Sequence, residues 1–149
     1  MTTLALEQDY WRLLGEGVGA IILYAIIGLA LMLIGFYAID LTTPGRLRGL
    51  VAAGKPNAVV VTAAGIISMA FIVVVAIYTS GGDLVEGLIA STVFGLIGIA
   101  AQVLSVRVLE RAIGIDIGKA LHSETFTPAS LAVAAAHFAL GLVVAFAVF

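Results

Sequence analysis

Few residues of this sequence could do chemistry, and the first candidate is a histidine inside an apolar stretch. His137 lies in "AVAAAHFALG", in the middle of a predicted membrane-spanning helix. A neutral imidazole offers one hydrogen-bond donor and one acceptor, and we expect it to face Ser68 and Gln102 inside a helix bundle. An ionisable residue at this depth is a candidate for a proton or solute path. The favoured alternative is a structural histidine that fixes helix register, because no Asp, Glu, Lys or Arg lies at that depth.

Two aspartates at the ends of predicted helices form a second candidate site. Asp40 and Asp116 would follow spans one and three, where a carboxylate opposes the helix dipole. We expect nearby basic side chains to compensate each charge. The basic residues near them are Arg46, Arg48, Arg111 and Lys119. The alternative is that the aspartates mark an entrance for a cation or a polyamine.

Other chemical sites are not expected. The sequence has no cysteine, which excludes disulfides and thiolate ligands, and His122 with Glu124 would supply only two metal ligands. No nucleophile, base and orienting residue form a recognisable group, so we predict neither an enzyme nor a cofactor. The net charge of −2 gives no reason to expect nucleic acid as a partner.

Composition identifies the medium that surrounds the chain. Of 149 residues, 62% are hydrophobic and 11% are charged, and the mean hydropathy is +1.22. In soluble domains, about a quarter of the residues are charged. A membrane core of about 30 Å needs roughly 20 apolar helical residues. We therefore predict an all-α membrane protein, a single domain over 1–149, with spans at Gly17–Ile39, Ala58–Thr79, Glu86–Val106 and Pro128–Phe149.

Charge asymmetry predicts the orientation of these spans. All basic residues except Arg12 fall in the connections 40–57 and 107–127. The positive-inside bias places these two connections in the cytoplasm and both termini outside. The segment before span one is acidic where a signal peptide would be basic, so we expect that span to be retained.

The two halves of the sequence resemble each other weakly. Ile39-Asp40 after span one matches Ile115-Asp116 after span three, and a separation of about 72 aligns Pro56 with Pro128. Each unit would hold two spans, so both copies enter the membrane in the same direction. The predicted repeats are the helical hairpins 17–79 and 83–149.

The connections carry their own helix signals. Thr43 as N-cap, Pro44 at the first helical position and Gly54 as terminator predict a short interfacial helix. The predicted caps of the later spans are Asn57 for span two, Asp83 with Glu86 for span three, and Thr127 for span four.

Small residues recur along single helical faces, as they do where membrane helices pack closely. Span three places such residues at Gly87, Ser91, Gly95 and Gly98, followed by Gln102. Span four repeats the pattern at Ser130, Ala134, His137, Gly141 and Ala145. We expect these faces to point inward. Glycine makes up 17 of 149 residues, which also permits seams between protomers, so we expect a homo-oligomer.

The segments "GFYAIDLTTPGRLRGL", "NAVVVTAAG" and "AAAHFALGLVVAFAV" resemble the bacterial domain-of-unknown-function 350 family of small inner-membrane proteins. The resemblance covers nearly the whole chain from about Gly17. It implies four spans in a duplicated hairpin and a place in the bacterial inner membrane, with gene neighbourhoods related to envelope stress or polyamines.

We predict a structural or interaction component of a membrane or envelope-stress-related assembly. Its expected partners are the lipid bilayer, further copies of itself, and other membrane or cytoplasmic proteins. The alternative is an oligomeric channel or transporter for a small ion or polyamine.

Overall fold

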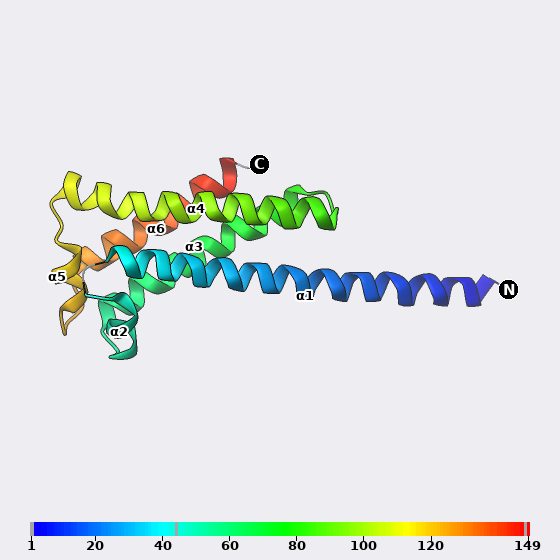
Figure 1. The fold of residues 1–149 in the computed structure, drawn as a ribbon, viewed down its shortest axis with the longest axis horizontal. Helices are drawn as coiled ribbons and strands as arrows, with labels where there is room; N and C mark the ends of the chain where they lie inside the picture. Colours follow the sequence, from blue (N-terminus) through cyan, green and yellow to red (C-terminus); the bar gives the residue numbers. More distant parts are fainter. Residues whose placement is uncertain (1, 44, 148) are drawn as a thin grey trace.

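The computed structural model describes residues 2–43, 45–147 and 149, with side chains from residue 9 onward. The regular secondary structure of the described residues is all helical (Figure 1). The helices are α1 (Thr2–Thr42), α2 (Leu47–Ala52), α3 (Pro56–Thr79), α4 (Leu84–Ile113), α5 (Ile117–His122) and α6 (Pro128–Ala147).

The all-α prediction is confirmed, because α1, α3, α4 and α6 are each long and apolar enough to cross a membrane. Two of these helices extend beyond the predicted spans by two turns or more. Helix α1 begins at Thr2 rather than Gly17, and α4 continues to Ile113 rather than Val106. Both extensions carry charged residues, so hydrophobicity alone did not reveal that the helix continues through them.

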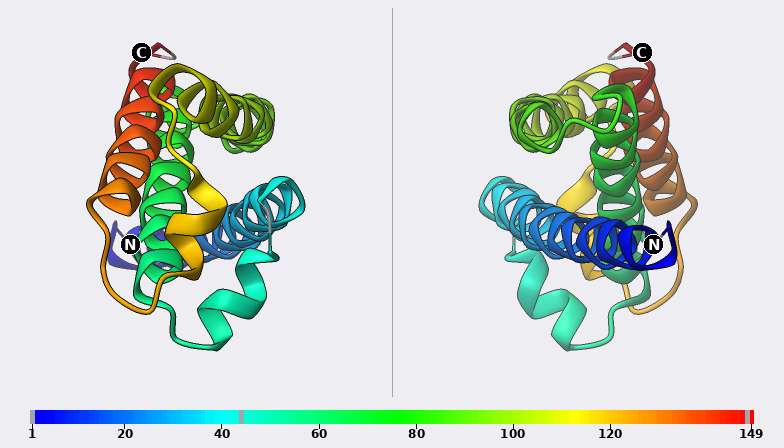
Figure 2. Two further views of the ribbon diagram at one scale, coloured as in Figure 1. Left: turned by 90° about the vertical axis from the view of Figure 1, so that its left-hand side faces the viewer. Right: turned by 90° about the vertical axis from the view of Figure 1, so that its right-hand side faces the viewer.

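Helix α3 is the centre of the bundle and packs against each of the other helices. Its most extensive partner is α6, and the two lie side by side in the views of Figure 2. Both run away from the end of the bundle that carries α2 and α5, which we call the loop end (Figure 1). Helices α1 and α4 run in the opposite direction and also pack together.

The N-terminal part of α1 projects beyond the rest of the bundle (Figure 1). The side chains of Tyr10, Trp11 and Leu13 are about 60% exposed. Further along α1, Tyr24 contacts the N-terminal part of α4 at Gly87. The projecting segment therefore lies on the N-terminal side of Tyr24.

The first connection differs from the prediction in how its helix begins. Thr43 is not an N-cap, because its hydroxyl donates to the carbonyl oxygen of Ile39 at 2.7 Å. Helix α2 starts later, after Arg46, which has a φ of 56° and makes no side-chain cap. Pro44 lies outside the described residues. Gly54 follows α2 with a φ of 71°, the left-handed conformation expected of a terminator.

Among the predicted caps, that of Asp83 is confirmed, since its side chain accepts from the Glu86 amide at 2.8 Å. The prediction for Asn57 is wrong: Lys55 precedes α3, Pro56 begins it, and Asn57 lies within its first turn. Thr127 directs its hydroxyl to Asn57 Oδ1 at 3.3 Å. This bond between segments takes the place of the predicted local cap.

Candidate functional site

Three helices meet in a polar layer within the apolar bundle. The Gln102 side-chain amide in α4 donates to the Ser68 hydroxyl in α3 at 2.7 Å. That hydroxyl donates in turn to the backbone carbonyl of His137 in α6 at 2.8 Å. All three residues are at most 1% exposed. This layer links α3, α4 and α6 at one depth.

The imidazole of His137 does not take part in this layer. Neither ring nitrogen has a hydrogen-bond partner among the described residues. The prediction that the ring would pair with Ser68 or Gln102 is therefore wrong, because Ser68 binds the histidine backbone instead. The hydroxyls of Thr62 and Ser91 are likewise buried without a partner within the described part of the chain. A buried polar group without a partner costs about 1–3 kcal/mol.

Small residues bring the helices close enough to form the layer. Gly141 faces Ser68 so closely that an added methyl group would meet the Ser68 Cα at 2.9 Å. A methyl group on Gly95 would meet a Leu31 Cδ atom at 2.6 Å. The structure buries the small residues of the predicted seams of α4 and α6. They are Gly87, Ser91, Gly95, Gly98, Ser130, Ala134, Gly141 and Ala145.

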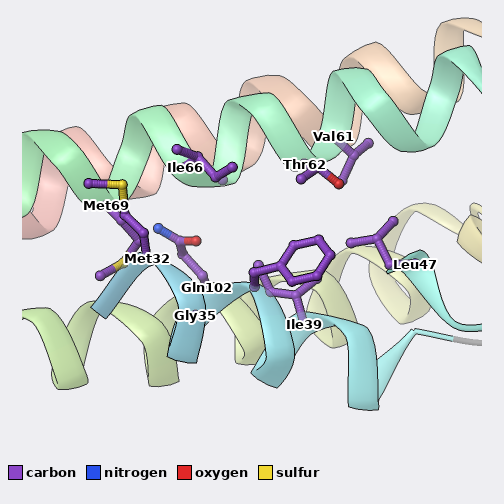
Figure 3. Close-up of a pocket in the computed structure, with 11 residues that line it drawn as sticks. Met32, Gly35, Ile39, Leu47, Val61, Thr62, Ile66, Met69 and Gln102 are labelled. Atoms are coloured by element: carbon purple, nitrogen blue, oxygen red, sulfur yellow. The ribbon is translucent and has the colours of Figure 1, made fainter. Parts of the chain in front are cut away.

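A small cavity adjoins the layer between α1, α3 and α4 (Figure 3). Its volume is about 10 Å³, and it is lined mainly by apolar side chains. Thr62 and Gln102 are its polar wall residues. A cavity needs roughly this volume to hold a single water molecule. The described interior therefore has no space here for a larger solute.

At the loop end, Asn57 joins α3 to the segment between α5 and α6. Its amide nitrogen donates to the carbonyl oxygen of Thr125 at 2.8 Å and to that of Ser123 at 3.3 Å. Its Oδ1 accepts from the Thr127 amide and from the Ser130 hydroxyl, each at 2.8 Å. Asn57 is completely buried. Sequence reasoning missed this contact because the partners lie about 70 residues away.

Asp40 lies near the start of α2, in a cleft of about 330 Å³. Its Oδ1 accepts a hydrogen bond of 2.7 Å from the backbone amide of Arg48. The charge is thus met by an amide at the beginning of α2, and no ion pair joins Asp40 to Arg46 or Arg48 among the described residues. The predicted compensation by a guanidinium group is wrong for the part of the chain that the structure describes.

Asp116 has a different position from the predicted one. Helix α4 ends at Ile113, because Gly114 adopts a left-handed φ of 71°. Asp116 is instead the N-cap of α5, and its side chain accepts from the Lys119 amide at 2.8 Å. A carboxylate there favours the helix dipole instead of opposing it. Asp116 and Asp40 line separate clefts, so the structure does not bring the two aspartates into one site.

Two further contacts at the loop end involve charged residues that sequence reasoning left unassigned. Lys55, the residue before α3, pairs with Glu124 in the connection before α6. Arg107 pairs with Glu110 at 2.9 Å and also donates to the last carbonyl oxygen of α1, that of Thr42. Only the Arg107–Glu110 pair has a signal in the sequence, the spacing of three residues.

The described residues contain no group of three or more His, Asp or Glu side chains that could hold a metal ion. The site is therefore a set of buried polar contacts and two clefts.

Comparison with known proteins places this arrangement of four apolar helices in a family. Residues 13–148 match the model of a family described as Domain of Unknown Function (DUF350). The chain belongs to this family. This match confirms the resemblance noted in the sequence, and the chain is called the DUF350 protein below.

The DUF350 protein also has named relatives. It is 38% identical over 134 residues to a UPF0719 transmembrane protein of Mycolicibacterium paratuberculosis, covering 89% of each chain. It is 36% identical over 128 residues to a UPF0719 transmembrane protein of Mycobacterium bovis, covering 81% of this chain and 84% of the relative. No solved structure matches it. The DUF350 protein is thus a multi-pass transmembrane protein, as predicted.

Proposed function

We propose that this DUF350 protein is a structural component of the bacterial inner membrane that assembles with further copies of itself. The observation that supports this proposal is the projecting part of α1. The apolar portion of α1 runs from Asp9 to Thr42, which is about 51 Å at 1.5 Å per residue. The hydrocarbon core is about 30 Å thick. The first turns of α1 therefore stand outside the core.

These turns carry an apolar stripe that nothing in the described chain covers. Tyr10, Leu14, Gly17 and Ile21 follow one another at intervals of four, three and four residues, which keeps them on one helical face. All four are exposed. The charged residues of this segment lie on the other side and pair along the helix. They are Asp9, Arg12 and Glu16.

A second copy is the occupant that fits this stripe. The stripe continues the face on which α1 packs against its own bundle, where Gly28 lies near Val73 and Leu31 near Gly95. Copies in one membrane with one orientation present identical stripes at the same height, so parallel pairing brings like positions together. The segment that carries the stripe, residues 10–21, is about as short as helices that are only marginally stable in water without tertiary contacts.

Disulfide crosslinking tests this pairing directly, because the native sequence has no cysteine. We expect Leu14→Cys to form a covalent dimer when isolated membranes are oxidised. The matched control is Arg12→Cys, on the charged side of the same turn, which should remain monomeric. Equal crosslinking of both variants, or of neither, would contradict pairing through this stripe and would favour lipid or another protein as its cover.

The proposal also specifies how the protein is oriented in the membrane and that its two halves are tandem repeats. The loop end holds every basic residue except Arg12, which supports a cytoplasmic position for this end and outside positions for both termini. Each half contains a long helix, a helix of six residues and another long helix, which supports a tandem repeat. Labelling of single cysteines from either side of the membrane would test the orientation.

A channel or transporter is the second candidate, and the unpartnered imidazole of His137 is the observation in its favour. Close packing of Gly141 on Ser68 beside it favours the structural alternative. In liposomes, a transport role predicts pH-dependent ion flux that His137→Leu abolishes. Unchanged flux in a folded His137→Leu protein would count against a path through this histidine.

A further inference from the structure

The cleft at Asp40 is formed where α1 ends and α2 begins. Its volume of about 330 Å³ lies at the lower end of the range of about 300–1,000 Å³ that is usual for ligand pockets. Its lining residues are Asp40, Leu41, Thr43, Gly45, Arg46 and Arg48. Because a membrane-spanning helix ends here, the cleft lies at the level of the lipid headgroups.

Both signs of charge are present in this cleft. Arg46 and Arg48 are exposed, and neither guanidinium group makes an ion pair or a hydrogen bond within the described residues. Asp40 uses Oδ1 to accept from the Arg48 amide. The side chains therefore offer two cations and one anion to a ligand.

The backbone that carries Arg46 is held in a strained turn. Arg46 has a φ of 56°. Among the described residues, it is the one residue other than glycine that has a positive φ. Such a conformation costs about 1–3 kcal/mol and persists where the surroundings enforce it. On one side the His122 ring packs against Gly45, and on the other Leu47 is 1% exposed. These contacts fix the position of the arginine backbone in the cleft.

We propose that this cleft binds the phosphoethanolamine headgroup of a membrane lipid. The guanidinium groups of Arg46 and Arg48 would take the phosphate, for which arginine has matching geometry. The Asp40 carboxylate would accept from the ammonium group. Leu41, which is 86% exposed, lies beside the cleft where it can contact the acyl chains.

Charge selects this ligand over two others. A polyamine would meet Asp40 but would be repelled by both arginines, and a purely anionic headgroup would leave Asp40 facing a like charge. A phosphocholine headgroup carries both charges, but its quaternary ammonium has no N–H group to donate to the carboxylate. Only a zwitterion with N–H donors satisfies all three side chains.

Native mass spectrometry of the delipidated protein can measure this preference with phosphatidylethanolamine, phosphatidylcholine and phosphatidylglycerol. We expect the wild type to bind phosphatidylethanolamine about tenfold more tightly than the other two, as one charge-assisted hydrogen bond would give. Asp40→Asn should remove this preference, since asparagine still accepts from the Arg48 amide but carries no charge. The double variant Arg46→Gln/Arg48→Gln should lose binding of all three lipids by about tenfold or more.

Arg111→Gln is the matched control, because Arg111 is an exposed arginine at the same end that does not line the cleft. It should bind lipids as the wild type does. Circular dichroism will check the fold, and Arg46→Gln alone replaces the double variant if that variant is unstable. Equal binding of the three lipids by the wild type, or undiminished binding by the arginine variants, would overturn the proposal. If equimolar soluble phosphoethanolamine displaced the lipid, the ligand would be a soluble molecule and not a membrane lipid, which would also overturn the proposal.

Discussion

Removing the Asn57 side chain should destabilise the loop end, because this completely buried side chain joins α3 to the connection before α6. Its amide makes hydrogen bonds of 2.8 Å with the Thr125 carbonyl, the Thr127 amide and the Ser130 hydroxyl. Asn57→Ala loses these three bonds. It also leaves the Thr127 amide without a protein partner.

The expected loss follows from the number of bonds. Each hydrogen bond contributes a net of about 1 kcal/mol to stability, so the three bonds contribute about 3 kcal/mol. The single proton of the Ser130 hydroxyl is shared between Asn57 Oδ1 and the Thr127 carbonyl, which lies at 2.7 Å and remains in the variant. The expected loss is therefore about 2–3 kcal/mol. Asn57→Asp preserves the volume but turns a carboxylate oxygen towards the carbonyl oxygens of Ser123 and Thr125. We expect it to be at least as destabilising as Asn57→Ala.

The assay is the free energy of unfolding in mixed micelles, measured by titration with a denaturing detergent and followed by circular dichroism. Val59→Ala is the control, since Val59 lies in the same turn of α3 and is 42% exposed. It should change the free energy of unfolding by less than about 0.5 kcal/mol. If Asn57→Ala costs under about 1 kcal/mol, the reasoning from buried hydrogen bonds at this end is refuted.

Three further predictions concern the middle of the bundle, and the free energy of unfolding measures each. Gly141→Ala should cost about 1–3 kcal/mol because its methyl group meets the backbone of Ser68. Gly15→Ala, with nothing within 4 Å and outside the apolar stripe of α1, should cost nothing; equal effects would exclude the close contact as the cause. Ser68→Ala and Gln102→Leu should show a coupling energy of about 0.5–3 kcal/mol in a double-mutant cycle, and additive effects would mean that their bond of 2.7 Å contributes nothing. His137→Leu should leave stability unchanged or raise it, because the ring has no partner to lose within the described residues, and a loss above about 1 kcal/mol would point to a partner that binds the ring.

The features that could be predicted from the sequence are those with a local or periodic signal. Long apolar runs indicated the four spans. The three- and four-residue spacing of Gly87, Ser91, Gly95 and Gly98 identified the face of α4 that the structure buries. Asp83 needed only its own position before a helix to be recognised as a cap. In each case the residues that form the feature lie within a few turns of one another.

The features that escaped prediction depend on distant segments or on the end of a helix. Asn57 resembles an N-cap locally, but its partners come from the connection before α6. The position of Asp116 changed because Gly114 ends α4 two residues earlier. The ring of His137 could not be assigned because sequence gives the depth of a side chain but not the atoms that meet it. Ser68 contacts the backbone of that residue, and no pattern distinguishes this from a contact with the ring.

The two short helices suggest why one aspartate lies in the last turn of α1 and another follows α4. Asp40 accepts from the amide of Arg48 in α2, and Asp116 accepts from the amide of Lys119 in α5. Each carboxylate thus meets the start of a six-residue helix, too short to be stable on its own. The aspartates differ in their surroundings, because the cleft at Asp40 has two arginines and that at Asp116 has one lysine. The same structural contact therefore leaves different charges free for a ligand, which is why the lipid site is proposed in the first half alone.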